Sequence, residues 1–130
     1  MFKRFFYSIS FIFVLILAGV ASAVVPAGWS NRDIGTSGGS VSVSGGTWTF
    51  RGDGEDIWGN SDAFHYAYVP LSGDGQISAR VVSNGFGSNT WAKGGVMIRE
   101  TLDTDSKHAM MIVTGGEGGG KAFQCRSTTS

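Results

Sequence analysis

The fold class is decided by the stretch Ser40-Val41-Ser42-Val43-Ser44-Gly45-Gly46-Thr47-Trp48-Thr49-Phe50-Arg51. Polar and apolar side chains alternate in residues 40–44 and again in residues 47–51, which is the period of a β-strand with one buried face. Two glycines separate the runs, and glycine tolerates the positive φ that both central positions of a tight hairpin turn require. The stretch therefore predicts a β-hairpin.

The same alternation recurs outward along the chain. It predicts five further strands, at residues 63–69, 76–83, 93–100, 107–114 and 121–126, with turn residues between them. No stretch of helical length repeats its apolar residues every 3.6 positions. Seven short strands at this spacing predict an all-β domain, either an antiparallel sandwich or a barrel.

The first 23 residues have the pattern of a secretory signal. Lys3 and Arg4 supply the positive start, residues 11–20 an apolar run, and Ala21-Ser22-Ala23 the small-x-small pattern of a cleavage site. The apolar run is shorter than the roughly 20 residues that span a bilayer. We therefore expect an extracellular product, secreted or at the cell surface, with no membrane attachment after cleavage.

Charge and cysteine content exclude several classes for the mature chain, residues 24–130. It keeps all ten acidic residues and eight of the ten basic ones, for a net charge of −2. Nucleic acid is not an expected partner, because its binding rewards a concentrated positive patch. The single cysteine, Cys125, excludes a disulfide scaffold and a cysteine-built zinc site. A free thiol, a pairing outside the chain and a partner in an absent segment all remain open for Cys125.

Several ordered blocks carry a likeness to a known superfamily. They are Gly28-Trp29-Ser30, Asp33-Ile34-Gly35, Gly54-Glu55-Asp56-Ile57-Trp58-Gly59, Asp62-Ala63-Phe64-His65-Tyr66, Trp91-Ala92-Lys93-Gly94-Gly95-Val96-Met97-Ile98-Arg99-Glu100 and Ser106-Lys107-His108-Ala109-Met110-Met111. From Trp29 to Arg126 the chain resembles the concanavalin A-like (lectin/glucanase superfamily) β-sandwich modules of secreted bacterial proteins. The resemblance implies a jelly-roll-like pair of antiparallel sheets with one concave face available for a ligand. Such modules range from sugar binders to hydrolases and plain spacers.

The sequence after the last predicted strand is short. Residues 121–126 read as a strand, yet only Ser127-Thr128-Thr129-Ser130 follows. A sandwich needs both sheets to cover its apolar faces, and modules of the resembled superfamily continue for several more strands. We therefore expect residues 24–130 to be the N-terminal part of a longer domain, incomplete at its C-terminus, with further domains in the same polypeptide and an unpaired sheet edge.

The acidic residues do not form the pattern of a glycoside hydrolase. Its two carboxylates face each other across the cleft, and the glucanase branch supplies them from one strand, whereas Asp53-Gly54-Glu55-Asp56 and Asp103-Thr104-Asp105 read as turns and Glu100 stands alone. We therefore expect no catalytic residues. Either turn could hold Ca²⁺ as a weaker alternative, but aspartate in a turn more often bonds its own backbone, so no cofactor or metal is predicted. His65 and His108 are too isolated to indicate zinc.

Aromatic side chains offer the better functional signal. Trp58 follows an acidic turn and Trp91 a polar loop, so both are candidates for an exposed rim where indole stacks on the apolar face of a sugar. His65 and Arg99 are candidate polar contacts on a solvent face. The competing interpretation is packing, since tryptophan is mostly buried.

Core stripes are predicted for three sets of side chains. They are Phe64 with Tyr66 and Tyr68, Val96 with Ile98, and Met110 with Ile112. The sequence thus predicts an exported, non-catalytic module that binds carbohydrate or polysaccharide, or acts as an accessory or spacer domain of a larger protein. Two alternatives stay open: part of a glycoside hydrolase whose acidic residues lie in an absent segment, and a purely structural cell-surface module.

Overall fold

The chain forms an all-β fold, as predicted, in a computed structural model that describes residues 25–85, 89–115 and 120–129. The strands within those residues are β1 (Ser30–Ile34), β2 (Ser40–Ser44), β3 (Thr47–Arg51), β4 (Ile57–Trp58), β5 (Ser61–Asp62), β6 (Phe64–Tyr68), β7 (Lys93–Arg99), β8 (His108–Thr114) and β9 (Lys121–Arg126). The same residues contain no helix long and apolar enough to cross a membrane. The predicted signal segment, residues 1–23, lies outside the described residues.

The hairpin predicted from residues 40–51 is confirmed. β2 and β3 pair antiparallel, with Val43 opposite Trp48. Gly45 and Gly46 form the turn with φ angles of 54° and 78°. Those angles lie in the left-handed region that favours glycine, which is why this dipeptide sets the register of both strands.

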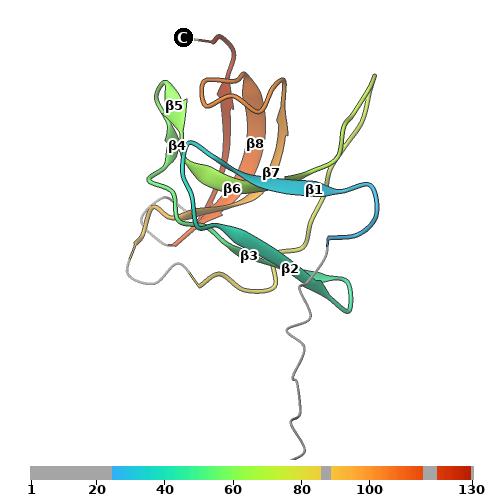
Figure 1. Ribbon diagram of the computed structural model, residues 1–130. Helices are drawn as coiled ribbons and strands as arrows, with labels where there is room; N and C mark the ends of the chain where they lie inside the picture. The colour runs from blue at the N-terminus through green and yellow to red at the C-terminus, as the bar shows by residue number, and fades with distance from the viewer. Residues whose placement is uncertain (1–24, 86–88, 116–119, 130) are drawn as a thin grey trace, which may run out of the picture.

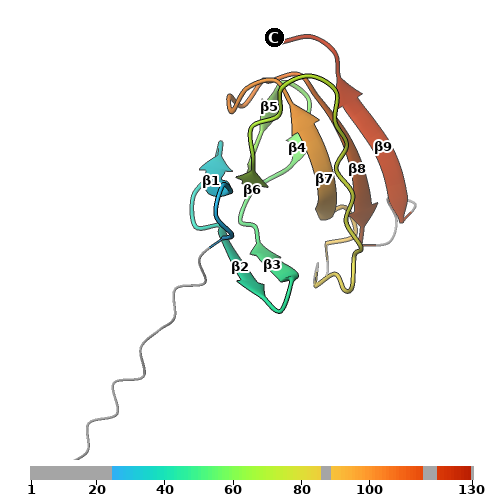
Figure 2. The ribbon, with the colours of Figure 1, turned by 90° about the vertical axis from the view of Figure 1, so that its right-hand side faces the viewer.

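The strands lie on two sides of the molecule (Figures 1 and 2). β7, β8 and β9 form a three-stranded antiparallel sheet on one side, and the β1–β6 and β2–β3 ladders lie on the other. β4 and β5 make a fourth, two-residue ladder. The strands opposite the three-stranded sheet are thus divided between separate ladders, and the jelly-roll-like pair of complete sheets stays a prediction.

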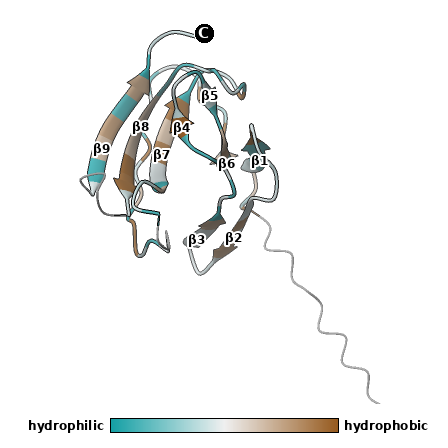
Figure 3. Cartoon of the chain, turned by 90° about the vertical axis from the view of Figure 1, so that its left-hand side faces the viewer, coloured by the Kyte–Doolittle hydropathy of each residue, from teal (hydrophilic) through white to brown (hydrophobic). Residues whose placement is uncertain are grey.

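The core lies on the inner face of the β7–β8–β9 sheet. Met97, Met110 and Ile112 are buried there, and Phe64 and Tyr66 pack against them from β6. The predicted core pairing of Met110 with Ile112 is confirmed. In Figure 3, β9 shows alternating hydrophilic and hydrophobic bands, as expected of a strand whose two faces differ.

The prediction that Val96 and Ile98 form a core stripe is wrong. Ile98 is 44% exposed, whereas Met97, its neighbour in sequence, is 7% exposed. Successive residues of a strand face opposite sides, so burying Met97 turns Ile98 outward. Arg99, two residues after Met97, then faces inward as well, where it pairs with Asp62 of β5.

The prediction of a strand at residues 76–83 is also wrong. These residues belong to no ladder among the described strands, and Ile77, Val81 and Val82 are 41%, 47% and 69% exposed. Alternation shows that a segment can present one apolar face, but a strand also needs a neighbour for its backbone hydrogen bonds. The other six predicted strands are present within a residue or two of the expected bounds, and three strands were not predicted: β1, β4 and β5.

Candidate functional site

The four tryptophans divide into an exposed pair and a packed pair. Trp58 is 66% exposed and Trp91 is 57% exposed. Trp29 and Trp48 instead pack against each other, with ring centroids 4.8 Å apart. The two tryptophans proposed as a rim from sequence are therefore those that the fold leaves accessible, and the other two act in packing.

Local turns hold both exposed rings outward. Trp58 ends the two-residue strand β4, which turns back at Gly59 with a φ of 60° and pairs with β5. Trp91 lies in a turn just before β7, where its backbone N–H donates to the side-chain oxygen of Asn89 at 2.9 Å.

Lys93 connects the two exposed tryptophans. Its ammonium lies 5.2 Å from the centroid of the Trp58 ring, and it is two residues from Trp91, a span of at most about 7 Å. Lys93 therefore contacts one exposed ring and lies close in sequence to the other. We call the set Trp58, Trp91, Lys93 and Asp56 the tryptophan surface.

Asp56 holds the Lys93 ammonium in place. The ammonium donates to Asp56 Oδ1 at 2.5 Å and to the carbonyl oxygen of Ile57 at 3.1 Å, and the Lys93 side chain is only 6% exposed. Sequence reasoning missed Lys93. The available signal was its position two residues after Trp91 at the start of a predicted strand, where a long side chain can pack its methylene groups beneath an aromatic ring.

Arg99 does not offer donors on a solvent face, so that prediction is wrong. Its side chain is 1% exposed, and its Nη1 donates to Asp62 Oδ2 at 3.3 Å. Its Nε donates to the carbonyl oxygen of Thr101 at 2.6 Å, and its Nη2 donates to that of Asp103. Burial lowers the pKa of Arg99, and the Asp62 carboxylate opposes that effect.

Asp62 is the centre of a buried charge cluster. Its carboxylate is fully buried and accepts hydrogen bonds from Arg126 Nη1 at 2.9 Å and Nη2 at 2.5 Å, besides the bond from Arg99. These hydrogen bonds are the main cause that raises the pKa of Arg126. His108 Nδ1 lies 3.8 Å from the same carboxylate. We call the four residues the Asp62 clamp.

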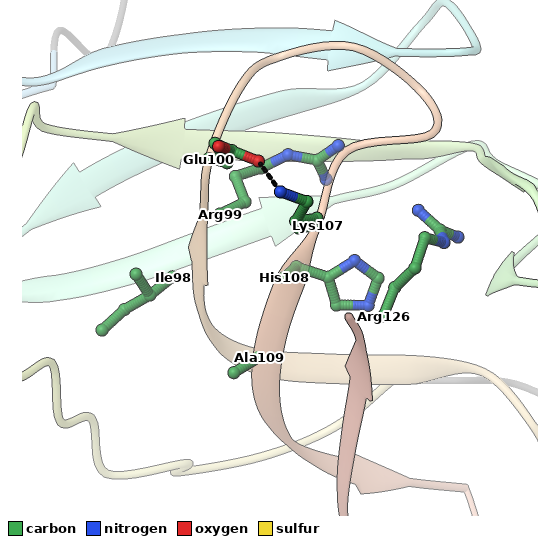
Figure 4. A pocket seen from close by; sticks show the side chains of 7 residues that line it. All are labelled: Ile98, Arg99, Glu100, Lys107, His108, Ala109 and Arg126. Atoms are coloured by element: carbon green, nitrogen blue, oxygen red, sulfur yellow. Dashed lines mark ion pairs between the residues drawn. The ribbon is translucent and has the colours of Figure 1, made fainter. Parts of the chain in front are cut away.

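The clamp arises from strand register. Arg99, His108 and Arg126 are direct neighbours across β7, β8 and β9, so their side chains form one row on the same face of the sheet. Figure 4 shows this row together with the exposed Glu100–Lys107 ion pair. These residues line an open recess of about 360 Å³. Both guanidinium groups also bond backbone carbonyls of residues 101–106. The clamp therefore fixes the β7–β8 connection and joins β5 to the sheet.

His65 is not at the surface either, so the solvent-face prediction is wrong for this residue as well. Its side chain is 4% exposed, and its Nδ1 lies 2.7 Å from Asp33 Oδ1. This hydrogen bond is the main cause that holds the pKa of Asp33 below its usual value. The Nε2 atom of His65 is buried with no hydrogen-bond partner among the described residues. The close approach of Gly39, where a Cβ would overlap both side chains, completes the enclosure.

The acidic turns considered for calcium are engaged within the chain. Asp56 Oδ1 accepts from the backbone N–H of Ile57 at 2.7 Å as well as from Lys93. Asp103 Oδ2 accepts from the Thr101 hydroxyl at 2.9 Å. Within the residues that the structure describes, no three His, Cys, Asp or Glu side chains are grouped to hold a metal ion.

No protein-family model, curated protein or solved structure matches the chain. The likeness to concanavalin A-like modules therefore stays a prediction from the sequence blocks.

Proposed function

We propose that the protein is an exported, non-catalytic module that binds polysaccharide through Trp58 and Trp91. The single observation that carries the proposal is their exposure, 66% and 57%, in a fold whose other two tryptophans are packed together. The flat apolar face of an exposed indole suits the C–H surface of a sugar ring.

Lys93 and Asp56 supply polar groups beside the rings. Their ion pair fixes the ammonium under Trp58 and leaves the Asp56 side chain 43% exposed, so a carboxylate oxygen can accept from a sugar hydroxyl. The pair carries no net charge, which favours neutral polysaccharides over acidic ones. In this proposal the exposed Asp56 carboxylate takes the place of Arg99 and His65, whose side chains are buried, and the buried Lys93 holds that carboxylate in position.

The proposal is tested by affinity electrophoresis in gels that contain neutral polysaccharides such as β-glucan, xylan or mannan. Retardation by one of them is expected, and Trp58→Ala and Trp91→Ala should each weaken it about tenfold or more, as loss of an aromatic anchor does. Phe50→Ala is the matched control, because Phe50 is 52% exposed on a different ladder. If both tryptophan variants were retarded as strongly as the unaltered protein, Trp58 and Trp91 would not be the binding site. If no polysaccharide retarded the protein, binding would be refuted and a spacer role would be favoured.

A further inference from the structure

The outer face of the β7–β8–β9 sheet is apolar and open. Ile98, Met111 and Phe123 are 44%, 53% and 66% exposed, and they come from three adjacent strands. Residues 75–77 border the face and leave a groove of about 270 Å³ beside these side chains. This surface is separate from the tryptophan surface and plays no part in the proposed function.

Among the described strands, β7 and β9 are the two edges of this sheet. The direction in which the backbone groups of β9 point can be derived from two hydrogen bonds. Thr114 N–H donates to the Gly120 carbonyl oxygen at 3.2 Å, so these two residues form a hydrogen-bonded pair. The Glu100 N–H also donates to the Lys107 carbonyl oxygen, so odd-numbered residues of β8 bond to β7 and even-numbered residues bond to β9. Hydrogen-bonding direction alternates along a strand. The N–H and C=O groups of Lys121, Phe123 and Cys125 therefore point away from β8, towards the open edge.

β9 lacks the usual protection of an edge strand. Natural edges carry proline, a bulge or charged side chains that discourage pairing. β9 pairs in unbroken register with β8 over its whole length and contains no proline. The Arg126 side chain turns inward to Asp62, which leaves Lys121 at one end as the outward charge.

We propose that two copies of the chain pair through β9, antiparallel, about a two-fold axis at Phe123, to form one six-stranded sheet. This register sets Phe123 opposite Phe123 of the second copy and Lys121 opposite Cys125. All three edge-facing residues then exchange backbone hydrogen bonds, about six in total. The apolar outer faces become continuous across the axis.

Side-chain chemistry favours a second copy in this register. Pairing places Arg126 opposite Gly120 of the second copy, so no like charges meet. A shift by one residue would oppose outer-face to inner-face residues, because side-chain direction alternates. The edge is thus complementary to itself in one arrangement, and the neighbouring one mismatches the two faces.

Sedimentation velocity of the purified protein at rising concentration tests the proposal. A dimer is expected, and Phe123→Lys should raise its dissociation constant about tenfold or more. Phe50→Lys, a charge at another exposed phenylalanine, should leave it unchanged. A monomer at all concentrations would overturn the proposal and leave the apolar face to a different partner. A dimer that Phe123→Lys does not weaken would also overturn it, because the interface would then lie elsewhere.

A cysteine cross-link tests the register even if Phe123→Lys folds poorly. Lys121→Cys faces the native Cys125 of the second copy at about 5.5 Å between Cα atoms, within the range of a disulfide. Mild oxidation should give a covalent dimer in this variant. The unaltered protein should give none, because its two Cys125 residues lie about 14 Å apart along the strands. Failure of Lys121→Cys to cross-link, or equal cross-linking of both proteins, contradicts the proposed register.

Discussion

Replacing Asp62 by asparagine should destabilise the fold more than any surface change. The substitution keeps the shape of the side chain but removes the charge that two buried guanidinium groups share. The Arg99 and Arg126 side chains are 1% and 10% exposed, so water cannot replace the lost carboxylate. Both arginines would be left as buried positive charges in one row with His108.

The expected loss follows from that geometry. Three hydrogen bonds reach the carboxylate, at 3.3, 2.9 and 2.5 Å. Removing one partner of a buried ion pair costs about 3–5 kcal/mol. A domain of this size is stable by about 5–15 kcal/mol, and each kcal/mol shifts its melting temperature by at least about 4 °C. Asp62→Asn should therefore lower the melting temperature by about 12 °C or more.

Urea unfolding at neutral pH, monitored by tryptophan fluorescence, measures this loss. Glu100→Gln is the control, because it breaks the exposed ion pair with Lys107, whose side chain is 48% exposed. Such a pair contributes at most about 1 kcal/mol. If Asp62→Asn were no more destabilising than Glu100→Gln, the clamp would not hold β5 to the sheet.

Three further predictions concern other parts of the fold. A Cβ at Gly54 would overlap a backbone carbonyl, so Gly54→Ala should lower the free energy of unfolding by about 1–3 kcal/mol, whereas Gly52→Ala, two residues away in open space, should change it little in the same denaturation assay. The pKa of Asp33 is lowered mainly by its hydrogen bond with His65, so the stability it contributes is present above its ordinary pKa of 3.8 and is lost as the pH falls through the lower folded value. Asp33→Asn should flatten that part of the pH–stability curve, and an unchanged slope would show that the pair is not responsible. Lys93→Met should weaken polysaccharide binding about two- to fivefold by removing the cation beneath Trp58, while the far-ultraviolet circular dichroism stays the same.

Local signals in the sequence were sufficient for most strands. The glycine pair at 45–46 fixes a hairpin because its φ angles are positive, and β9 was predicted at its observed bounds because alternation and flanking turn residues agree. Short strands such as β4 and β5 have no such signal. Two residues are too few to show a period, and their pairing depends on Gly59 and on contacts distant in sequence.

Long-range partners explain the errors at the site. An arginine at the end of a strand is expected to face water, and only the buried Asp62, 37 residues away, reverses that orientation for Arg99. The same reversal put Ile98 outside and Met97 inside. Trp58 and Trp91 were placed at a rim because turns precede them, but Lys93 joins them through a contact with Asp56 that no local pattern encodes.

The ion pair between Asp62 and Arg126 also bears on how the chain is made. The two residues are 64 positions apart, so during synthesis Asp62 leaves the ribosome well before its principal partner exists. Until β9 arrives, the carboxylate is better solvated by water than buried, and a contact of such long range closes slowly. The nascent chain therefore stays open until β9 is available. For a polypeptide that crosses a membrane unfolded, as residues 1–23 predict, this delay would keep it competent for translocation.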